Sequence, residues 1–160
     1  MASHLRFRPG PVHLFKSNID PDSLVEPGDM LFLDSSEARP ASQFVWDTDL
    51  PTTQAAFADA FLGIAHERSE PGESSPISVD LSPQSVYEFD VDISSYTLGT
   101  LLGPDESSSS LMSQQLEMVG ASDQAVARCM EFTDGFVTRA RVCFASAYST
   151  ASANTTAAIG

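Results

Sequence analysis

Residues 86–93 show the most regular pattern in the chain, because apolar and polar side chains alternate along them. Successive side chains of a strand point to opposite faces, so this period of two predicts a strand with one buried and one solvated face. Residues 77–81 and 136–148 alternate in the same way and are also predicted to be strands. In the most regular strand the apolar face holds Tyr87, Phe89, Val91 and Ile93, and the polar face holds Glu88, Asp90 and Asp92.

Shorter apolar runs predict further strands. Residues 30–33 are apolar throughout and lie between the turn-forming residues 26–29 and 34–36. Residues 43–46, after an Arg-Pro pair, and residues 116–119 are two more strand candidates. All three runs have the length of ordinary strands.

One segment has the pattern of a helix. Residues 54–61 are rich in alanine, follow a capping-type threonine and place Phe57 and Phe61 four positions apart. A glycine and a β-branched residue come next and favour a change from helix to strand near Leu62. Residues 123–132 suit either a helix or a strand.

Many short strands, turn signals at roughly ten-residue spacing and one short helix predict a mainly β fold, a small β-barrel or a sandwich. We expect an extended N-terminal arm over residues 1–20, where basic, aromatic, Pro and Gly residues mix without a sustained period. A single β-rich domain over residues 21–148 should follow. Residues 149–160 are small and polar, which is typical of a flexible C-terminal tail.

Charge changes this picture, because the 160 residues carry a net charge of −14 that is unevenly distributed. Residues 17–127 hold 20 acidic and 2 basic side chains, a net charge of −18. Residues 1–16 hold three basic side chains and no acidic one, and residues 128–160 have a net charge of +1. Phosphate contacts require clustered Lys and Arg, so we expect no nucleic-acid partner.

The chain offers little sequence support for a metal site. His4, His13 and His66 are widely separated, and no CxxC element accompanies them. Asp90-x-Asp92-x-Ser94 begins like a calcium loop, but Ser95 stands where glycine is needed and Leu101 where glutamate is needed. We therefore expect no metal and no cofactor.

Motifs of covalent catalysis are also missing. No serine lies in a G-x-S-x-G turn, and the glycines are isolated, unlike those of a phosphate-binding loop. Cys129 and Cys143 are more often free and buried in such a chain, although a disulfide between neighbouring strands stays open. We expect a protein that is not an enzyme. No apolar run approaches the roughly 18 residues of a membrane span, and no secretory signal is visible, so we expect no membrane partner.

A resemblance to a known family rests on several short sequences in a fixed order. Residues 27–33 read PGDMLFL, residues 61–65 read FLGIA, and a Pro-Gly turn precedes ISV at residues 77–79. Residues 86–89 read VYEF, and GTLLGP follows at residues 99–104. Over roughly residues 25–145 the chain resembles the small β-barrel capsid decoration proteins, or cement proteins, of tailed phages.

The resemblance implies a structural virion protein that binds the outside of a phage head and stabilises it. Its partners would be the major capsid protein and further copies of itself, with a homotrimer favoured. It would be made in the host cytoplasm and reside on the capsid exterior. The basic, aromatic arm is the expected contact region, through Arg6, Phe7, Arg8, Phe15 and Lys16.

Two other functions remain open at this point. One is a non-catalytic β-barrel adaptor, or a tail or host-surface binding module with the same fold and another partner. The other is an enzyme with a site assembled on the barrel, which a convergent cluster of histidine and carboxylate in a deep pocket would support.

Overall fold

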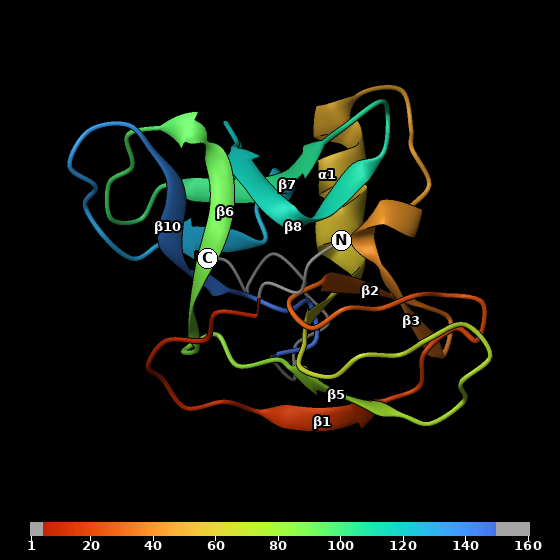
Figure 1. Cartoon of the computed structure of the whole chain (residues 1–160). Coiled ribbons are helices and arrows are strands. Elements are labelled where there is room, and N and C mark those ends of the chain that lie inside the picture. Colours follow the sequence, from red (N-terminus) through yellow and green to blue (C-terminus); the bar gives the residue numbers. More distant parts are fainter. Residues whose placement is uncertain (1–4, 150–160) are drawn as a thin grey trace.

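A computed structural model describes residues 5–149. These residues form a closed five-stranded β-barrel and a second, antiparallel five-stranded sheet, which lies below the barrel in Figure 1. One α-helix stands beside the barrel in this part of the chain. The predicted class, mainly β with one short helix, is confirmed.

The antiparallel sheet is formed by the first half of the chain. Its strand order is β1-β5-β4-β2-β3, so the N-terminal strand and the second strand of a hairpin form its edges. The strands are β1 Leu14–Ser17, β2 Met30–Asp34, β3 Glu37–Pro40, β4 Phe61–Ala65 and β5 Ile77–Asp80.

The barrel is formed by the second half of the chain, with strand order β10-β6-β8-β7-β9. β6 and β8 are parallel, and the other pairs are antiparallel. The strands are β6 Val86–Ser94, β7 Leu101–Glu106, β8 Leu111–Met118, β9 Ala127–Cys129 and β10 Val137–Phe144.

Helix α1 (Leu50–Ala60) begins at a well-defined cap. The Asp49 side chain accepts a hydrogen bond from the Thr52 amide, and a proline occupies the first turn, where its missing N–H is not needed. The helix ends at Ala60 and β4 starts at Phe61, so the predicted change from helix to strand is confirmed.

Two apolar clusters lie on opposite faces of the antiparallel sheet. Met30 and Phe32 of β2 belong to the larger cluster, which fills the barrel and contacts α1. Leu31, between them in sequence, belongs to the smaller cluster with Ile19 and Val79. Because strand side chains alternate between faces, one fully apolar strand supplies both clusters.

Five predicted strands are present as β2, β5, β6, β8 and β10, although β8 begins earlier, at Leu111. The prediction for residues 43–46 is wrong, because a 3₁₀ turn, η1 (Ala41–Gln43), precedes an irregular segment there. Phe44 in that segment packs edge-on against Phe32 and Phe57, at ring-centroid distances of 4.9 and 5.4 Å. Aromatic packing, and not strand pairing, therefore places it.

β3 and β7 were not predicted from the sequence. A glycine in β7 explains the difference, because an added Cβ at Gly103 would lie 2.6 Å from the backbone oxygen of Gln124. Gly103 thus allows a close backbone approach within a strand. The ambiguous residues 123–132 contain a 3₁₀ turn, η2 (Ser122–Gln124), followed by β9.

Cys129 and Cys143 are free thiols on neighbouring strands. Cys129 pairs with Val142, and Cys143 pairs with Arg128, so the two cysteines are offset by one position. An offset of one points their side chains to opposite faces, which explains why adjacent strands do not join them. Burial raises the pKa of both thiols.

Candidate partner-contact surfaces

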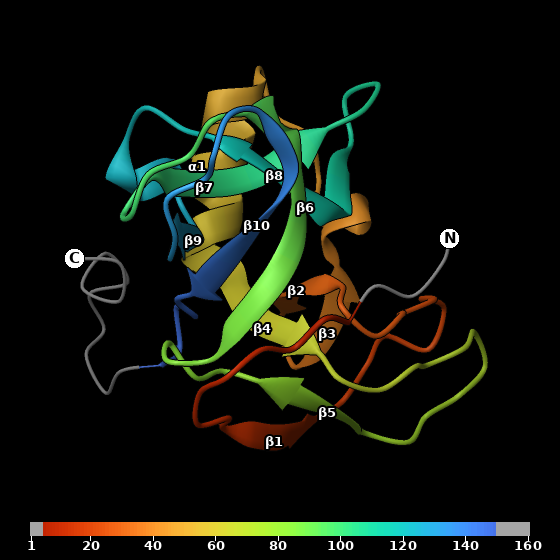
Figure 2. The same ribbon diagram turned by 60° about the vertical axis from the view of Figure 1, so that its left-hand side comes forward.

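The first half of the predicted arm, residues 5–9, is extended and lies along β6 (Figure 2). The Arg8 amide donates to the Val86 carbonyl, and the Val86 and Glu88 amides donate to the carbonyls of Pro9 and Arg6. The segment thereby covers an edge of β6 that β8, which pairs farther along, leaves open.

The second half of the arm contains β1, which pairs with β5 from Leu14–Asp80 to Ser17–Ile77. We call residues 5–17 the N-terminal segment. It is extended, as predicted, and it supplies strand-like backbone pairing to both the barrel and the sheet. The predicted tail from residue 150 onward lies outside the described residues.

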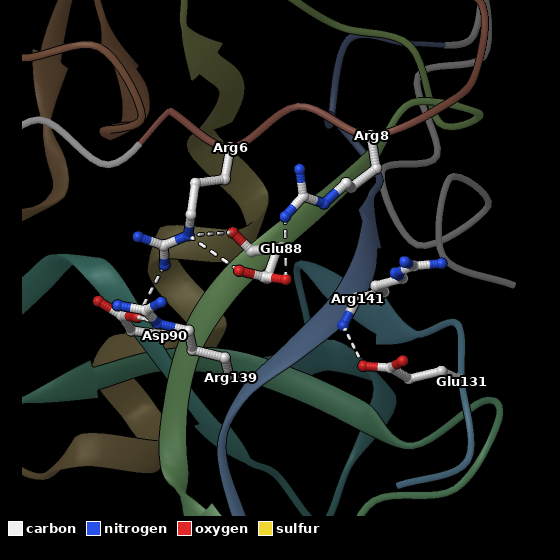
Figure 3. A network of polar contacts seen from close by, with 7 residues as sticks. All are labelled: Arg6, Arg8, Glu88, Asp90, Glu131, Arg139 and Arg141. Carbon is white, nitrogen blue, oxygen red and sulfur yellow. Dashed lines mark hydrogen bonds and ion pairs between the residues drawn. The ribbon is translucent and has the colours of Figure 1, made fainter.

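Ion pairs join the N-terminal segment to the solvated face of β6 (Figure 3). Arg6 Nη2 lies 2.7 Å from Asp90 Oδ1, and Arg8 Nη2 lies 3.1 Å from Glu88 Oε2. From the other side, Arg139 Nε of β10 lies 3.3 Å from the same Asp90 oxygen. Asp90, the first residue of the apparent calcium loop, is therefore engaged by two arginines.

The five predicted contact residues divide into two groups. Arg6, Phe7 and Arg8 lie on β6, where the Phe7 ring packs against Tyr87 at 5.6 Å between centroids. Phe15 packs against the smaller apolar cluster, and Lys16 pairs with Glu67 at 2.7 Å. Their side chains contact the protein's own body, and their role in binding a partner stays a prediction.

A polar cluster lies beneath Phe7. Tyr87 Oη donates to Asp80 Oδ2 at 2.6 Å, and His66 Nε2 lies 2.6 Å from Tyr87 Oη. The His13 amide also donates to the Asp80 carboxylate, at 2.9 Å. Asp80 therefore ties the N-terminal segment to the junction between sheet and barrel.

Burial and hydrogen bonding fix the charges in this cluster. Burial raises the pKa of Asp80, but hydrogen bonds from Ser85, Tyr87, Ser82 and His13 outweigh it and hold that pKa below its usual value. Burial lowers the pKa of His66, against the opposing effect of Asp80. Burial and then the Asp80 carboxylate raise the pKa of Tyr87. These contacts favour an ionised Asp80 that accepts hydrogen bonds from both the barrel and the N-terminal segment.

No group of three or more His, Cys, Asp or Glu side chains within residues 5–149 is arranged to hold a metal ion. In the same residues, α1 is too short to cross a membrane and no longer apolar helix is present.

A second surface, which sequence reasoning missed, lies at one end of the barrel. Phe132 and Phe136, in the loop between β9 and β10, are 74% and 78% exposed. Leu98, in the loop between β6 and β7, and Met130 are also exposed. We call these four side chains the aromatic end.

Hydrogen bonds hold the two loops of the aromatic end together, on the left of Figure 1. The Thr133 amide donates to the Tyr96 carbonyl at 3.0 Å, and the Tyr96 amide donates to Thr133 Oγ1 at 2.8 Å. The Gly99 amide donates to the Cys129 carbonyl. The exposed side chains therefore project from two loops that are hydrogen-bonded to each other.

Strand alternation predicted that Ile93 lies on the apolar face of its strand, but the structure exposes it, and Phe136, at the start of the alternating run 136–148, is exposed as well. The register between β6 and β10 shifts between Val137 and Arg139, where the barrel ends. β6 advances four residues there, from Ser94 to Asp90, while β10 advances two, so the regular ladder is interrupted and alternation no longer indicates burial at this point. The sequence feature that could have indicated this exposed surface is the pair Phe132 and Phe136 on either side of the Asp134-Gly135 turn.

Arg141 borders the aromatic end. The Met130 amide donates to its carbonyl, and its own amide donates to Glu131 Oε1 at 2.8 Å. Its guanidinium extends away from the Arg6–Asp90 network in Figure 3 and forms no ion pair with the described residues.

No protein-family model matches the chain, and no curated protein shows significant similarity to it. A mainly β molecule with a closed barrel, a strongly acidic composition and two distinctive surfaces is what the sequence and structure define.

Proposed function

We propose that this protein is a structural virion protein, a capsid decoration or cement protein that binds the outside of a phage head and stabilises it. The observation that carries the proposal is the aromatic end, where two phenylalanines project into solvent from hydrogen-bonded loops. Exposed apolar clusters on a rigid frame are typical of protein-binding surfaces. The resemblance of residues 25–145 to decoration proteins supports a phage capsid as the assembly concerned.

The charge distribution also supports this function. A net charge of −14 keeps unassembled copies apart and soluble in the host cytoplasm, where they would be made. The partners would be the major capsid protein and further copies of this chain, with a trimer favoured, on the capsid exterior. The protein would act by binding alone, without a catalytic step or a cofactor.

The N-terminal segment is the proposed contact with the shell. It already covers the edges of β5 and β6, which protects them from pairing with other chains. Parts of its basic side chains stay accessible, because the side chains of Arg8 and Lys16 are 40% and 58% exposed. These two cations can contact acidic groups on a shell while the backbone of the N-terminal segment stays paired with β5 and β6.

Quantitative mass spectrometry of purified, washed phage heads tests the proposal. We expect the chain at a copy number close to that of the major shell protein, and bare heads should regain it when purified protein is added. A chain that is absent from heads but present in separated tails would overturn the decoration role and favour the tail-module alternative.

A matched pair of variants tests the contact region. Arg8→Ala with Lys16→Ala should lower the occupancy of bare heads, because it removes two accessible cations. Ser36→Glu with Ser107→Glu changes the net charge by the same amount at exposed positions outside the N-terminal segment and should bind normally. Equal binding of the two variants would contradict a shell contact through the N-terminal segment.

A further inference from the structure

A cavity of about 430 Å³ lies along the first half of β8. Every residue from 110 to 115 lines it, together with Ser42 of η1 and Asp90 of β6. Successive side chains of a strand point to opposite faces, so a cavity on one face would be lined by every second residue. Six consecutive lining residues therefore place this cavity at the edge of the strand.

This edge of β8 is uncovered because β6 joins it late. The pairing of β8 with β6 begins at Gln115, and the earlier part of β6 pairs with the N-terminal segment instead. η1 is tied to β8 at the same place, since the Ser42 amide donates to Ser113 Oγ at 3.1 Å and Ser110 Oγ donates to the Ser42 carbonyl at 3.0 Å. The cavity therefore lies where β6, β8 and η1 meet without filling the space between them.

The side-chain amide of Gln114 places an unsatisfied acceptor at this cavity. Gln114 is only 6% exposed, and its Nε2 donates to Asp29 Oδ1 at 2.6 Å, which fixes the orientation of the amide. Its Oε1 is buried and receives no hydrogen bond from residues 5–149. Buried polar atoms normally have partners, and an acceptor without one destabilises the fold. Because Gln114 lines the cavity, a ligand there can supply the missing donor.

The charges around the cavity favour a neutral ligand. Asp90 is the one charged residue in the described lining, and its carboxylate is already engaged by Arg6 and Arg139 at 2.7 and 3.3 Å. An anion would be repelled by Asp90 and by the net charge of −14. A cation would have to compete with two arginines.

The remaining lining combines hydrogen-bonding groups with apolar ones. Ser42 Oγ forms no hydrogen bond with the described residues, so it can donate or accept. Gln115 Nε2 donates to Asp105 Oδ2 at 2.8 Å, which leaves its Oε1 as a further acceptor. Leu111 and Met112 supply apolar contact area.

We infer that this cavity binds a small neutral sugar. Two amide oxygens, of Gln114 and Gln115, require donors, and a sugar ring carries several hydroxyl donors in a small volume, whereas a peptide of the same size carries few N–H groups. The C–H groups of the ring suit Leu111 and Met112. The cavity lies within the range of roughly 300–1,000 Å³ that is typical of small-ligand sites. The inference goes beyond the proposed function and does not depend on it.

A two-dimensional ¹H–¹⁵N NMR titration of the full chain tests the inference, with D-glucose, D-galactose, D-mannose and N-acetyl-D-glucosamine as probes. We expect at least one of these sugars to shift the amide signals of residues 110–115, with a Kd of about 10 mM or tighter. The side-chain NH₂ signals of Gln114 should shift with them, because its carbonyl oxygen gains a donor. Four sugars that leave all these signals in place, or that shift only signals elsewhere, overturn the inference.

A neutral peptide, N-acetyl-trialanine amide, is titrated in parallel. If the peptide shifts the signals of residues 110–115 and the sugars do not, the cavity accepts an extended polypeptide and the assignment to a sugar is wrong.

A matched pair of variants tests the polar groups of the lining. Ser42→Ala with Gln115→Ala removes two groups offered to the ligand and should weaken binding by about tenfold. Ser36→Ala with Gln84→Ala makes the same changes at exposed positions outside the cavity and should bind like the wild type. The NMR spectra of both variants show directly whether they are folded. Equal affinities of the two folded variants for the sugar would contradict the inference.

Discussion

Asp80 accepts hydrogen bonds from three parts of the molecule. The Tyr87 hydroxyl comes from the barrel, the His13 amide from the N-terminal segment, and the Ser82 amide from the turn after β5. The carboxylate is almost fully buried, yet its pKa is held below the usual value because these donors favour the charged form. Asp80 therefore stabilises the fold as an anion.

Asp80→Asn should lower the free energy of unfolding by about 2 kcal/mol at neutral pH, because an amide cannot replace all these charge-assisted acceptor sites. The pKa of Asp80 is lower in the folded state than the ordinary value of 3.8, so its contribution is complete above that pH. It is lost as the pH falls through the folded-state pKa.

Urea unfolding of the wild type and Asp80→Asn between pH 7 and pH 2.5 measures this effect. The difference between the two proteins should stay constant down to about pH 4 and shrink below it. Asp22→Asn, at an exposed turn position, is the control and should be close to neutral. A difference that grows at acidic pH would contradict the anchoring role.

At the scale of elements, close approach between β4 and β5 depends on one glycine. β4 is buried along its whole length, with β2 on one side and β5 on the other. An ideal Cβ on Gly63 would lie only 2.2 Å from the backbone oxygen of Asp80. No side chain fits there unless the two strands separate.

Gly63→Ala should therefore destabilise the protein by at least about 2 kcal/mol, as overpacking against rigid backbone does. Gly120→Ala is a matched control, because a Cβ at Gly120 would meet nothing within 4 Å. Thermal unfolding of both variants checks the prediction. Equal melting temperatures would show that β4 and β5 can adjust.

The N-terminal segment shows how an element can depend on distant strands. Residues 5–9 have no regular hydrophobic period, and their conformation comes from the open edge of β6. The partly exposed ion pairs of Arg6 and Arg8 contribute at most about 1 kcal/mol each. The backbone hydrogen bonds and the packing of Phe7 on Tyr87 therefore contribute as much as the ion pairs to holding residues 5–9 on β6.

At the scale of the whole molecule, the excess of acidic side chains opposes folding. Twenty-two acidic residues face only eight basic ones, so the compact state brings together fourteen more negative than positive side-chain charges. Salt screens this repulsion over about 10 Å at 0.1 M.

The melting temperature should therefore rise when sodium chloride increases from about 10 mM to about 0.5 M, because screened repulsion outweighs the weakened ion pairs. Differential scanning calorimetry at neutral pH measures the shift. A melting temperature that falls with salt would mean that the Arg6, Arg8 and Arg139 ion pairs contribute more than the repulsion costs.

The sequence alone determined the fold class and several elements, because the signals involved are local. Alternation identified β6, and the Ala-rich stretch before Gly63 located the change from α1 to β4. Composition showed that the acidic charge belongs to the body and that the first sixteen residues are basic. These properties depend on nearest neighbours in the chain or on simple counts.

Tertiary structure decided the rest, because partners distant in sequence fix it. β7 is a strand through its pairing with β8 and β9, despite Gly103 and Pro104. The N-terminal segment is held by strands sixty or more residues away in the sequence. Phe136 lies in the loop just before β10, where the barrel ends, and is exposed, so neither its apolar character nor its place in an alternating run could reveal the aromatic end.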